Sequence, residues 1–422
     1  MKLNWLKIAG ISACLLVSTS VQADTLLIKN AKLVDGVERA EGVVDIAVRD
    51  GRIQQIGTDL TADDTTRVID AAGKPVTPGL FNVNTQIGLM EVGAVAASVD
   101  ARAMREDVTA SLRVADAYNA SSTVVPYNRM LGITNAVVQP GNGTSLIAGT
   151  AAVVKLSATD GVVEPGAAMV VNLADTGSAL TGGSKAAAMA KLREALEDAR
   201  DYARNTTQFN SGNRRDYSLS RHDLAALKPV IERRMPLLVY VERASDIERV
   251  LRLAADLRIS LILSGVSEGW RVADKIAKAE VPVIIDPIRN LPNSYESLGA
   301  RLDNAKLMHE AGVTLMFTGM GWQTTHNAYL VRQSAGNAVA NGLPYNAAIQ
   351  AITSAPAKIF GVPQYGHLKA GASATLVVWS GDPLEVMSNP ELVLIDGQMY
   401  PLESRHTRLR DRYFQAIQQY TN

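Results

Sequence analysis

Pairs of polar side chains follow several short apolar runs of this sequence, at a spacing that places each pair on one face of a strand. Tyr240 and Glu242 end one run, and Asn84 and Gln86 end another. Residues two apart in a strand point to the same side, and parallel sheets carry their sites at the carboxyl ends of strands. The four side chains predict a polar pocket, in which Glu242 could be a general base or hold a cation. The alternatives are an ion pair of Glu242 with Arg243 or another arginine at the barrel mouth, and a volume-filling role for Tyr240.

Four further residues are candidates for the same pocket. His326 and Asn327 follow the run "VTLMFTG", which makes His326 a second candidate catalytic group and Asn327 a candidate ligand contact. Lys155 ends "AAVVK" and Asp286 follows "VPVII", so both are candidates for binding a substrate. Structural roles stay open for these residues: a hydrogen-bonded histidine, a salt bridge for Lys155 and a loop cap for Asp286.

The glycine-rich segment "PGNGTSLIAG", residues 140–149, could cradle an anion with backbone N–H groups. It lacks the Lys-Ser/Thr ending of a phosphate-binding loop.

The first 23 residues predict a secretory signal peptide. Lys2 and Lys7 precede an apolar run, and Val21-Gln22-Ala23 suits a cleavage site, while the run is too short to span a membrane. A lipoprotein signal ending at Cys14 is the alternative. We therefore expect a periplasmic or secreted protein with no membrane span.

Composition then excludes several kinds of chemistry. Cys14 is the only cysteine, so the mature chain would have no thiol nucleophile, disulfide or thiolate metal site. Without the two lysines of the signal, 40 basic and 42 acidic residues leave a net charge of −2. No basic stripe with interleaved aromatic residues suggests nucleic acid as a partner.

The two ends of the mature chain share strand signals, whereas the middle alternates strands with helices. Residues 24–78 contain alternating runs and the turn Asp50-Gly51, and residues 368–402 return to that pattern. We predict that they form one composite β-sandwich. Residues 79–367 hold about eight strand signals, the number of a closed (β/α)₈ TIM-like barrel of class α/β. Residues 403–422 predict a surface helix.

These phrases resemble the amidohydrolase superfamily over nearly all of the mature chain, in particular secreted members similar to imidazolonepropionase. The resemblance is carried in order by "LIKNAKLVDG", "DGRIQQIG", "VIDAAGKPVTPGL", "AITSAPAKIFGV", "GHLKAGASATLVVWSGDPL" and "VLIDGQ". It implies hydrolysis of non-peptide carbon–nitrogen bonds, such as amides or lactams. It also implies metal ligands at strand ends: His-x-His after strand one, histidines after strands five and six, and an aspartate after strand eight.

The sequence departs from that ligand pattern at every position. The residues that fall on the five places are Asn84, Gln86, Tyr240, Gly265 and Gly319. The chain has five histidines, and none is in a His-x-His or an i, i+4 pair. Metals such as zinc require imidazole, thiolate or carboxylate ligands, so we predict no metal cofactor.

Three classes of function stay open. The first is a metal-free pseudoenzyme, for example a partner subunit in a homo-oligomer or in a complex with an active homologue. The second is a binder of a small polar molecule. The third is a hydrolase of carbon–nitrogen bonds that works without metal through Glu242 and His326. A lone general base contributes about 10²- to 10⁴-fold, well short of the effect of a metal-bound hydroxide.

Overall fold

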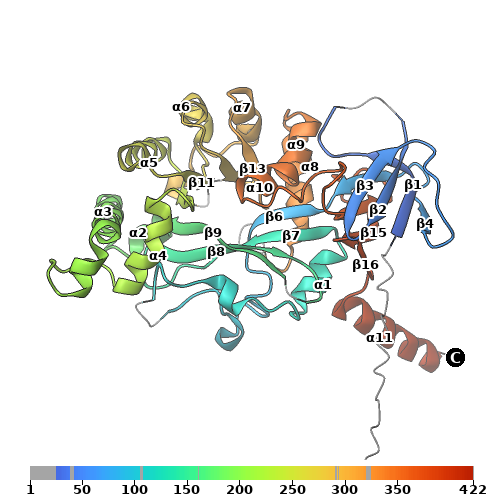
Figure 1. The fold of residues 1–422 in the computed structure, drawn as a ribbon, viewed down its shortest axis with the longest axis horizontal. Helices are drawn as coiled ribbons and strands as arrows, with labels where there is room; N and C mark the ends of the chain where they lie inside the picture. The colour runs from blue at the N-terminus through green and yellow to red at the C-terminus, as the bar shows by residue number, and fades with distance from the viewer. Residues whose placement is uncertain are drawn as a thin grey trace, which may run out of the picture.

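The computed structural model describes residues 25–38, 42–104, 108–159, 161–289, 292, 294–319 and 325–421, the last seven as backbone only. The predicted signal peptide lies outside the described residues. A barrel with surrounding helices and a second sheet at one end make up the described chain (Figure 1).

The second sheet contains strands from both ends of the sequence, as the composite sandwich requires. Its order is β16-β15-β14-β5-β1-β2-β3, with β4 paired to β1. The strands are β1 (Thr25–Leu33), β2 (Val44–Arg49), β3 (Arg52–Gly57), β4 (Arg67–Asp70), β5 (Pro75–Pro78), β14 (Leu376–Trp379), β15 (Pro390–Ile395) and β16 (Gln398–Tyr400). The two ends meet where β5 pairs antiparallel with β14, with Thr77 opposite Val377.

A buried tryptophan fixes this junction against the barrel. Trp379 is fully buried, and its indole N–H donates a 2.9 Å hydrogen bond to the Thr77 hydroxyl. On the barrel side, a Cβ at Gly132 would lie 2.5 Å from the Trp379 ring, so only glycine allows this approach. The junction therefore combines apolar packing with one buried hydrogen bond.

The barrel sheet has the order β13-β12-β11-β10-β9-β8-β7-β6. Its strands are β6 (Leu80–Thr85), β7 (Ile133–Val138), β8 (Ile147–Lys155), β9 (Val162–Asn172), β10 (Leu237–Val241), β11 (Leu261–Gly265), β12 (Val283–Ile285) and β13 (Leu315–Phe317). At the seam between the first and last strands, the Thr318 hydroxyl donates to Asn82 Oδ1 at 3.1 Å. The predicted TIM-like barrel is confirmed.

One strand of the barrel does not run parallel to the others, contrary to the expectation of repeated parallel units. Strand β8 pairs antiparallel with both β7 and β9. None of the described residues in the connections on its two sides, 139–146, 156–159 and 161, is helical. A parallel connection needs a crossover of a dozen or more residues, so these short loops allow only antiparallel pairing.

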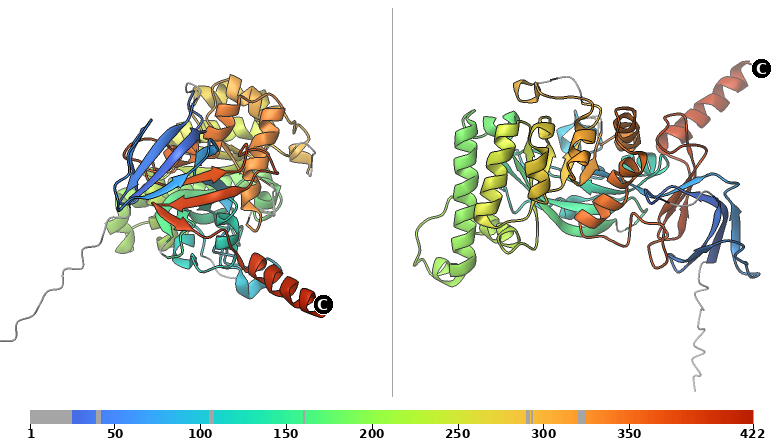
Figure 2. Two further views of the ribbon diagram at one scale, coloured as in Figure 1. Left: turned by 90° about the vertical axis from the view of Figure 1, so that its right-hand side faces the viewer. Right: turned by 90° about the horizontal axis from the view of Figure 1, so that it is seen from above.

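Helices surround the barrel on its outer face and close one end of it (Figures 1 and 2). The α-helices are α1 (Val124–Arg129), α2 (Asp175–Ala179), α3 (Lys185–Asn210), α4 (Arg221–Ile231), α5 (Ala244–Leu257), α6 (Ala273–Lys278), α7 (Asn304–Glu310), α8 (Val331–Ala340), α9 (Tyr345–Ala351), α10 (Ser354–Ile359) and α11 (Arg405–Thr421). The 3₁₀ turns are η1 (Ala96–Ser98), η2 (Val114–Ala117), η3 (Gly269–Arg271), η4 (Tyr295–Ser297) and η6 (Ala328–Leu330). Helix α11 extends away from the body beside the composite sheet (Figure 2).

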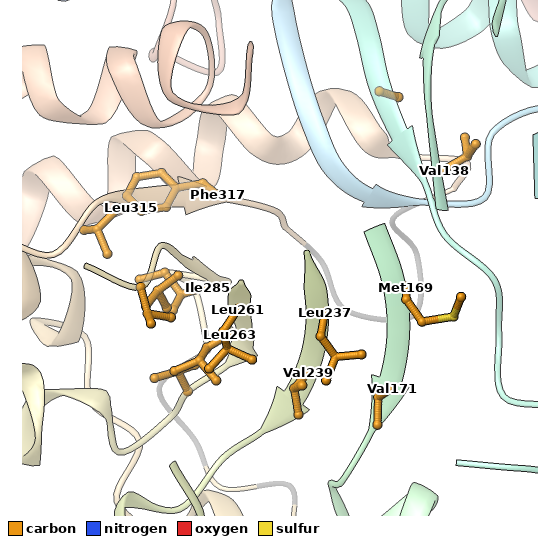
Figure 3. Packing of buried hydrophobic residues seen from close by; sticks show 14 of the residues in the cluster. Val138, Met169, Val171, Leu237, Val239, Leu261, Leu263, Ile285, Leu315 and Phe317 are labelled. Atoms are coloured by element: carbon orange, nitrogen blue, oxygen red, sulfur yellow. The ribbon is translucent and has the colours of Figure 1, made fainter. Parts of the chain in front are cut away.

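Strand alternation divides the apolar residues of the barrel into two layers. Leu237 and Val239 of β10 belong to the layer that packs against the helices, and Figure 3 shows their equivalents on neighbouring strands. Leu238 belongs to the interior layer. Phe360, just after α10, is part of the same cluster of buried residues. The parity of β10 therefore places Tyr240 on the interior side. No helix in the described part of the chain is long and apolar enough to cross a membrane.

Candidate functional site

A cavity of about 440 Å³ opens at the carboxyl ends of the barrel strands. Its wall includes four of the residues that the sequence singled out: Asn84, Tyr240, Glu242 and Asp286. They come from the ends of β6, β10 and β12, which are far apart in the sequence. The side chain of Tyr240 forms part of the wall without filling the space.

Tyr240 is held in place by Gln139, the residue that follows β7. Its hydroxyl donates a 2.9 Å hydrogen bond to Gln139 Oε1, and the Gln139 amide donates to the Val83 carbonyl at 2.6 Å. Burial raises the pKa of the Tyr240 phenol well above its ordinary value. Tyr240 therefore stays a neutral phenol at neutral pH.

Glu242 lies just beyond β10 and is only 8% exposed. Its Oε2 accepts hydrogen bonds from the backbone N–H of Ser267 at 3.0 Å and from the Ser267 hydroxyl at 2.6 Å. The Arg289 guanidinium lies 3.3 Å from Oε1. Burial raises the pKa of Glu242 above its ordinary value, although Ser267 and Arg289 both favour the ionised form.

A strained turn after β11 brings Ser267 to this carboxylate. Gly265 and Val266 both have positive φ, 91° and 52°. A β-branched residue rarely adopts this conformation, which costs about 1–3 kcal/mol. The turn is anchored because the Val266 N–H donates to the Val241 carbonyl at 2.8 Å and Asn304 donates to the Val266 carbonyl at 3.0 Å.

The segment after β12 crosses the mouth of the barrel. Near its start, Arg289 reaches the end of β10 through Glu242, and further on Glu296 reaches the loop after β9. Glu296 is 5% exposed, accepts the Asp175 N–H at 2.7 Å and pairs with Lys185 at 2.5 Å. These contacts hold η4 against the far side of the cavity.

Gln86 does not line this cavity, although its spacing from Asn84 predicted a shared face. Strand β6 ends at Thr85, and its register with β7 is irregular between Asn82 and Thr85. The strict alternation therefore stops before Gln86. Its backbone N–H instead donates a hydrogen bond to the Thr325 hydroxyl oxygen at 3.2 Å.

Lys155 lies at the opposite end of the barrel, which corrects its predicted place in the pocket. Because β8 is antiparallel, its last residue pairs with Asn135 near the start of β7. The Lys155 ammonium forms a 2.9 Å ion pair with Asp396 of the composite sheet. A structural salt bridge, the alternative considered from the sequence, describes this contact.

His326 and Asn327 line a different cavity, of about 520 Å³, together with Glu91, Tyr127 and His406. His326 Nε2 lies 2.7 Å from the Glu91 carbonyl oxygen. Both residues thus lie away from the first cavity. The predicted partnership of His326 with Glu242 is therefore not supported by their positions.

The glycines of residues 140–149 serve close packing in this structure. The Gly141 N–H donates to the Ala101 carbonyl at 2.9 Å, and a Cβ at Gly143 would lie 2.4 Å from the Ala103 carbonyl oxygen. Steric contact with Ala103 accounts for Gly143 without an anion.

Several wall residues were missed from the sequence. They are Asn172, Ser264, Ser267, Arg289, Glu296 and Arg301. Asn172 and Ser264 end or nearly end predicted apolar runs, so strand ends gave a usable signal for them. Ser267, Arg289 and Arg301 lie in loops and Glu296 lies in η4, and no pattern in the sequence marked them as wall residues.

The residues aligned with the family's metal ligands do not fit a metal centre. A Cβ at Gly265 would lie 2.7 Å from Glu242 Oε1, and one at Gly319 would lie 2.3 Å from the Ser334 hydroxyl. Neither a histidine at 265 nor an aspartate at 319 could be accommodated without displacing these groups. Among the described residues, no group of three or more His, Cys, Asp or Glu side chains could hold a metal ion.

Known proteins share this architecture. The structure of an amidohydrolase from Thermotoga maritima MSB8 matches with a TM-score of 0.79 at 21% identity, covering 89% of this chain and 99% of that one. N-isopropylammelide isopropylaminohydrolase from Burkholderia multivorans matches with a TM-score of 0.51 at 14% identity, covering 89% and 99%. Residues 232–400 also match the amidohydrolase family.

Curated relatives agree with these matches. Amidohydrolase tasK of Hapsidospora irregularis is 20% identical over 397 residues, covering 86% of this chain and 40% of that protein. Dihydroorotase of Geobacter sulfurreducens is 29% identical over 127 residues, covering 29% and 28%. The chain spans two fifths or less of the length of these two relatives. The chain has the fold of amidohydrolases, and residues 232–400 match that family in sequence.

Proposed function

We propose that this chain is a metal-free member of its superfamily that binds a small polar molecule at the barrel mouth. The observation that carries the proposal is the contact between Gly265 and Glu242. A Cβ at position 265 would overlap the Glu242 carboxylate, so that carboxylate takes up space next to the strand end where the family places a histidine. What surrounds it is an open cavity of about 440 Å³.

The polar lining supports binding over a purely structural role. A scaffold with no ligand could fill this space with apolar side chains, because a buried polar group without a partner costs about 1–3 kcal/mol. Instead, Tyr240 and Glu242 are each oriented by hydrogen bonds from other strands or loops. Orientation of polar groups around an open cavity is typical of ligand sites.

Metal-independent hydrolysis through Glu242 is the second candidate. It is favoured by one observation: burial raises the pKa of this carboxyl, which makes it a better general base at neutral pH. In such a reaction the Glu242 carboxylate would take a proton from water as the oxygen attacks the carbonyl carbon of an amide. The carbon–nitrogen bond would then break, and the proton would pass to the departing nitrogen.

A role as partner subunit, in a homo-oligomer or beside an active homologue, remains a separate proposal. So does a periplasmic or secreted location, which rests on residues 1–23 of the sequence. An adjacent gene for a homologue with an intact His-x-His would favour a hetero-complex.

The test uses the mature chain, beginning at Asp24, purified without chelators. We expect far less than one zinc, iron or manganese per chain by elemental analysis, and ligand-observed NMR should detect fragments bound in the cavity. An amide and lactam screen, with Glu242→Gln as the comparison, separates the two candidates. Turnover that Glu242→Gln abolishes would favour the hydrolase, and stoichiometric metal that Glu242→Ala removes would refute the metal-free proposal.

A further inference from the structure

The wall of the barrel-mouth cavity carries an excess of negative charge. Of the described residues that line it, four have carboxylates and two have guanidiniums, a net charge of −2. The carboxylates are those of Asp175, Glu242, Asp286 and Glu296, and the guanidiniums are those of Arg289 and Arg301. This balance is local, because the mature chain as a whole is nearly neutral.

Both guanidiniums are already engaged by protein groups. Arg289 pairs with the buried Glu242 at 3.3 Å. Arg301 pairs with Asp303, and its guanidinium lies 4.7 Å from the centre of the Trp270 ring. An anionic ligand would have to compete with these partners.

The acidic side of the cavity is only partly neutralised from behind the wall. A single ammonium, that of Lys185, serves both Glu296 at 2.5 Å and Asp175 at 3.3 Å. It also donates to the Leu173 carbonyl at 2.9 Å. Lys185 adds one positive charge next to Asp175 and Glu296, and Asp303 adds one negative charge next to Arg301. Including both leaves the net charge of the wall and these two partners at −2.

We infer that the natural ligand carries a cationic nitrogen, such as a primary ammonium or an amidinium, which lies against Asp175 or Asp286. This inference rests on the proposed function. Asp286 is at the end of β12, and its Oδ1 accepts the Ile288 N–H at 3.2 Å, which orients the carboxylate. The partly enclosed setting strengthens the attraction relative to open water, because its effective dielectric constant is lower.

The experiment compares three probes that share a ring and differ in charge: benzylammonium, benzyl alcohol and benzoate. Dissociation constants are measured by NMR titration on the mature chain at low ionic strength. We expect benzylammonium to bind about tenfold more tightly than benzyl alcohol, and benzoate to bind most weakly. Added salt should weaken benzylammonium binding and leave benzyl alcohol unchanged.

Two variants and a matched control locate the effect. Asp286→Asn and Asp175→Asn should each weaken benzylammonium binding about threefold or more, with little effect on benzyl alcohol. Asp256→Asn makes the same change of charge on the exposed outer face of α5 and should leave both constants unchanged.

The outcomes separate this inference from the proposed function. Benzoate binding as tightly as benzylammonium would overturn the inference, because the arginines would then select the ligand. Equal weakening by Asp256→Asn would also overturn it, since the effect would come from net charge. If neither these probes nor a diverse fragment collection shifts resonances of cavity residues, the proposed function itself fails.

Discussion

Replacing Gly265 by alanine tests the contact on which the proposed function depends. Gly265 has φ of 91°, and a Cβ there would lie 2.7–3.0 Å from three atoms of the Glu242 carboxylate group. The left-handed backbone costs an alanine about 1–2 kcal/mol. Overlap with the carboxylate adds about 1–3 kcal/mol, as in other overpacked sites. We therefore expect Gly265→Ala to lower the free energy of unfolding by about 2–5 kcal/mol.

Gly312 provides a matched control for the backbone effect. It has nearly the same φ, 89°, but a Cβ there would meet nothing within 4 Å. Gly312→Ala should therefore cost only about 1–2 kcal/mol. The difference between the two alanine variants measures the overlap with Glu242.

The assay is urea-induced unfolding followed by circular dichroism, with all variants at one pH and temperature. Adding Glu242→Ala to Gly265→Ala removes the atoms that overlap, so the two changes should be coupled by about 1–3 kcal/mol. If Gly265→Ala costs no more than Gly312→Ala, or if the double variant shows no coupling, Glu242 does not occupy this space.

Three further predictions use the same measurement. Gly319→Ala should destabilise the chain by about 1–3 kcal/mol because its Cβ would meet the Ser334 hydroxyl, and Ser334→Gly should recover most of that loss; no recovery would count against the contact. Because burial raises the pKa of folded Glu242 above its unfolded value, the stability that depends on its protonated form is present at acidic pH and lost as pH rises through the folded pKa. Glu242→Gln should thus gain stability relative to wild type as the pH rises above 4.5, the ordinary pKa of a glutamate, and parallel curves would contradict this. Trp379→Phe should cost about 1–3 kcal/mol because it leaves the buried Thr77 hydroxyl without its donor, and Thr77→Val in that background should cost little more.

Much of the fold could be predicted because it depends on local patterns. Alternating residues and turn dipeptides identified the strands at both ends of the chain and led to the prediction that they share one sheet, in which β5 pairs with β14. The alternation of β10 also placed Tyr240 and Glu242 at one cavity. In each case the spacing of residues within one strand decides which face a side chain occupies.

The direction of β8 was predictable in principle but was missed. The loops before and after it are too short for the crossover that parallel pairing needs, a limit set by chain length alone. Reading it as one more parallel strand placed Lys155 at the wrong end of the barrel.

By itself, then, the sequence determined the fold class, the five residues that the resemblance aligns with the family's metal ligands and the polar character of the strand ends. Only the tertiary structure decided which polar groups meet. The partners of Glu242 are Ser267 and Arg289, which follow two other strands, and His326 lines a separate cavity. The physical reason is that residue spacing fixes the face of a strand, whereas the path of a loop is fixed by contacts with residues distant in sequence, such as those that hold the strained turn at Val266.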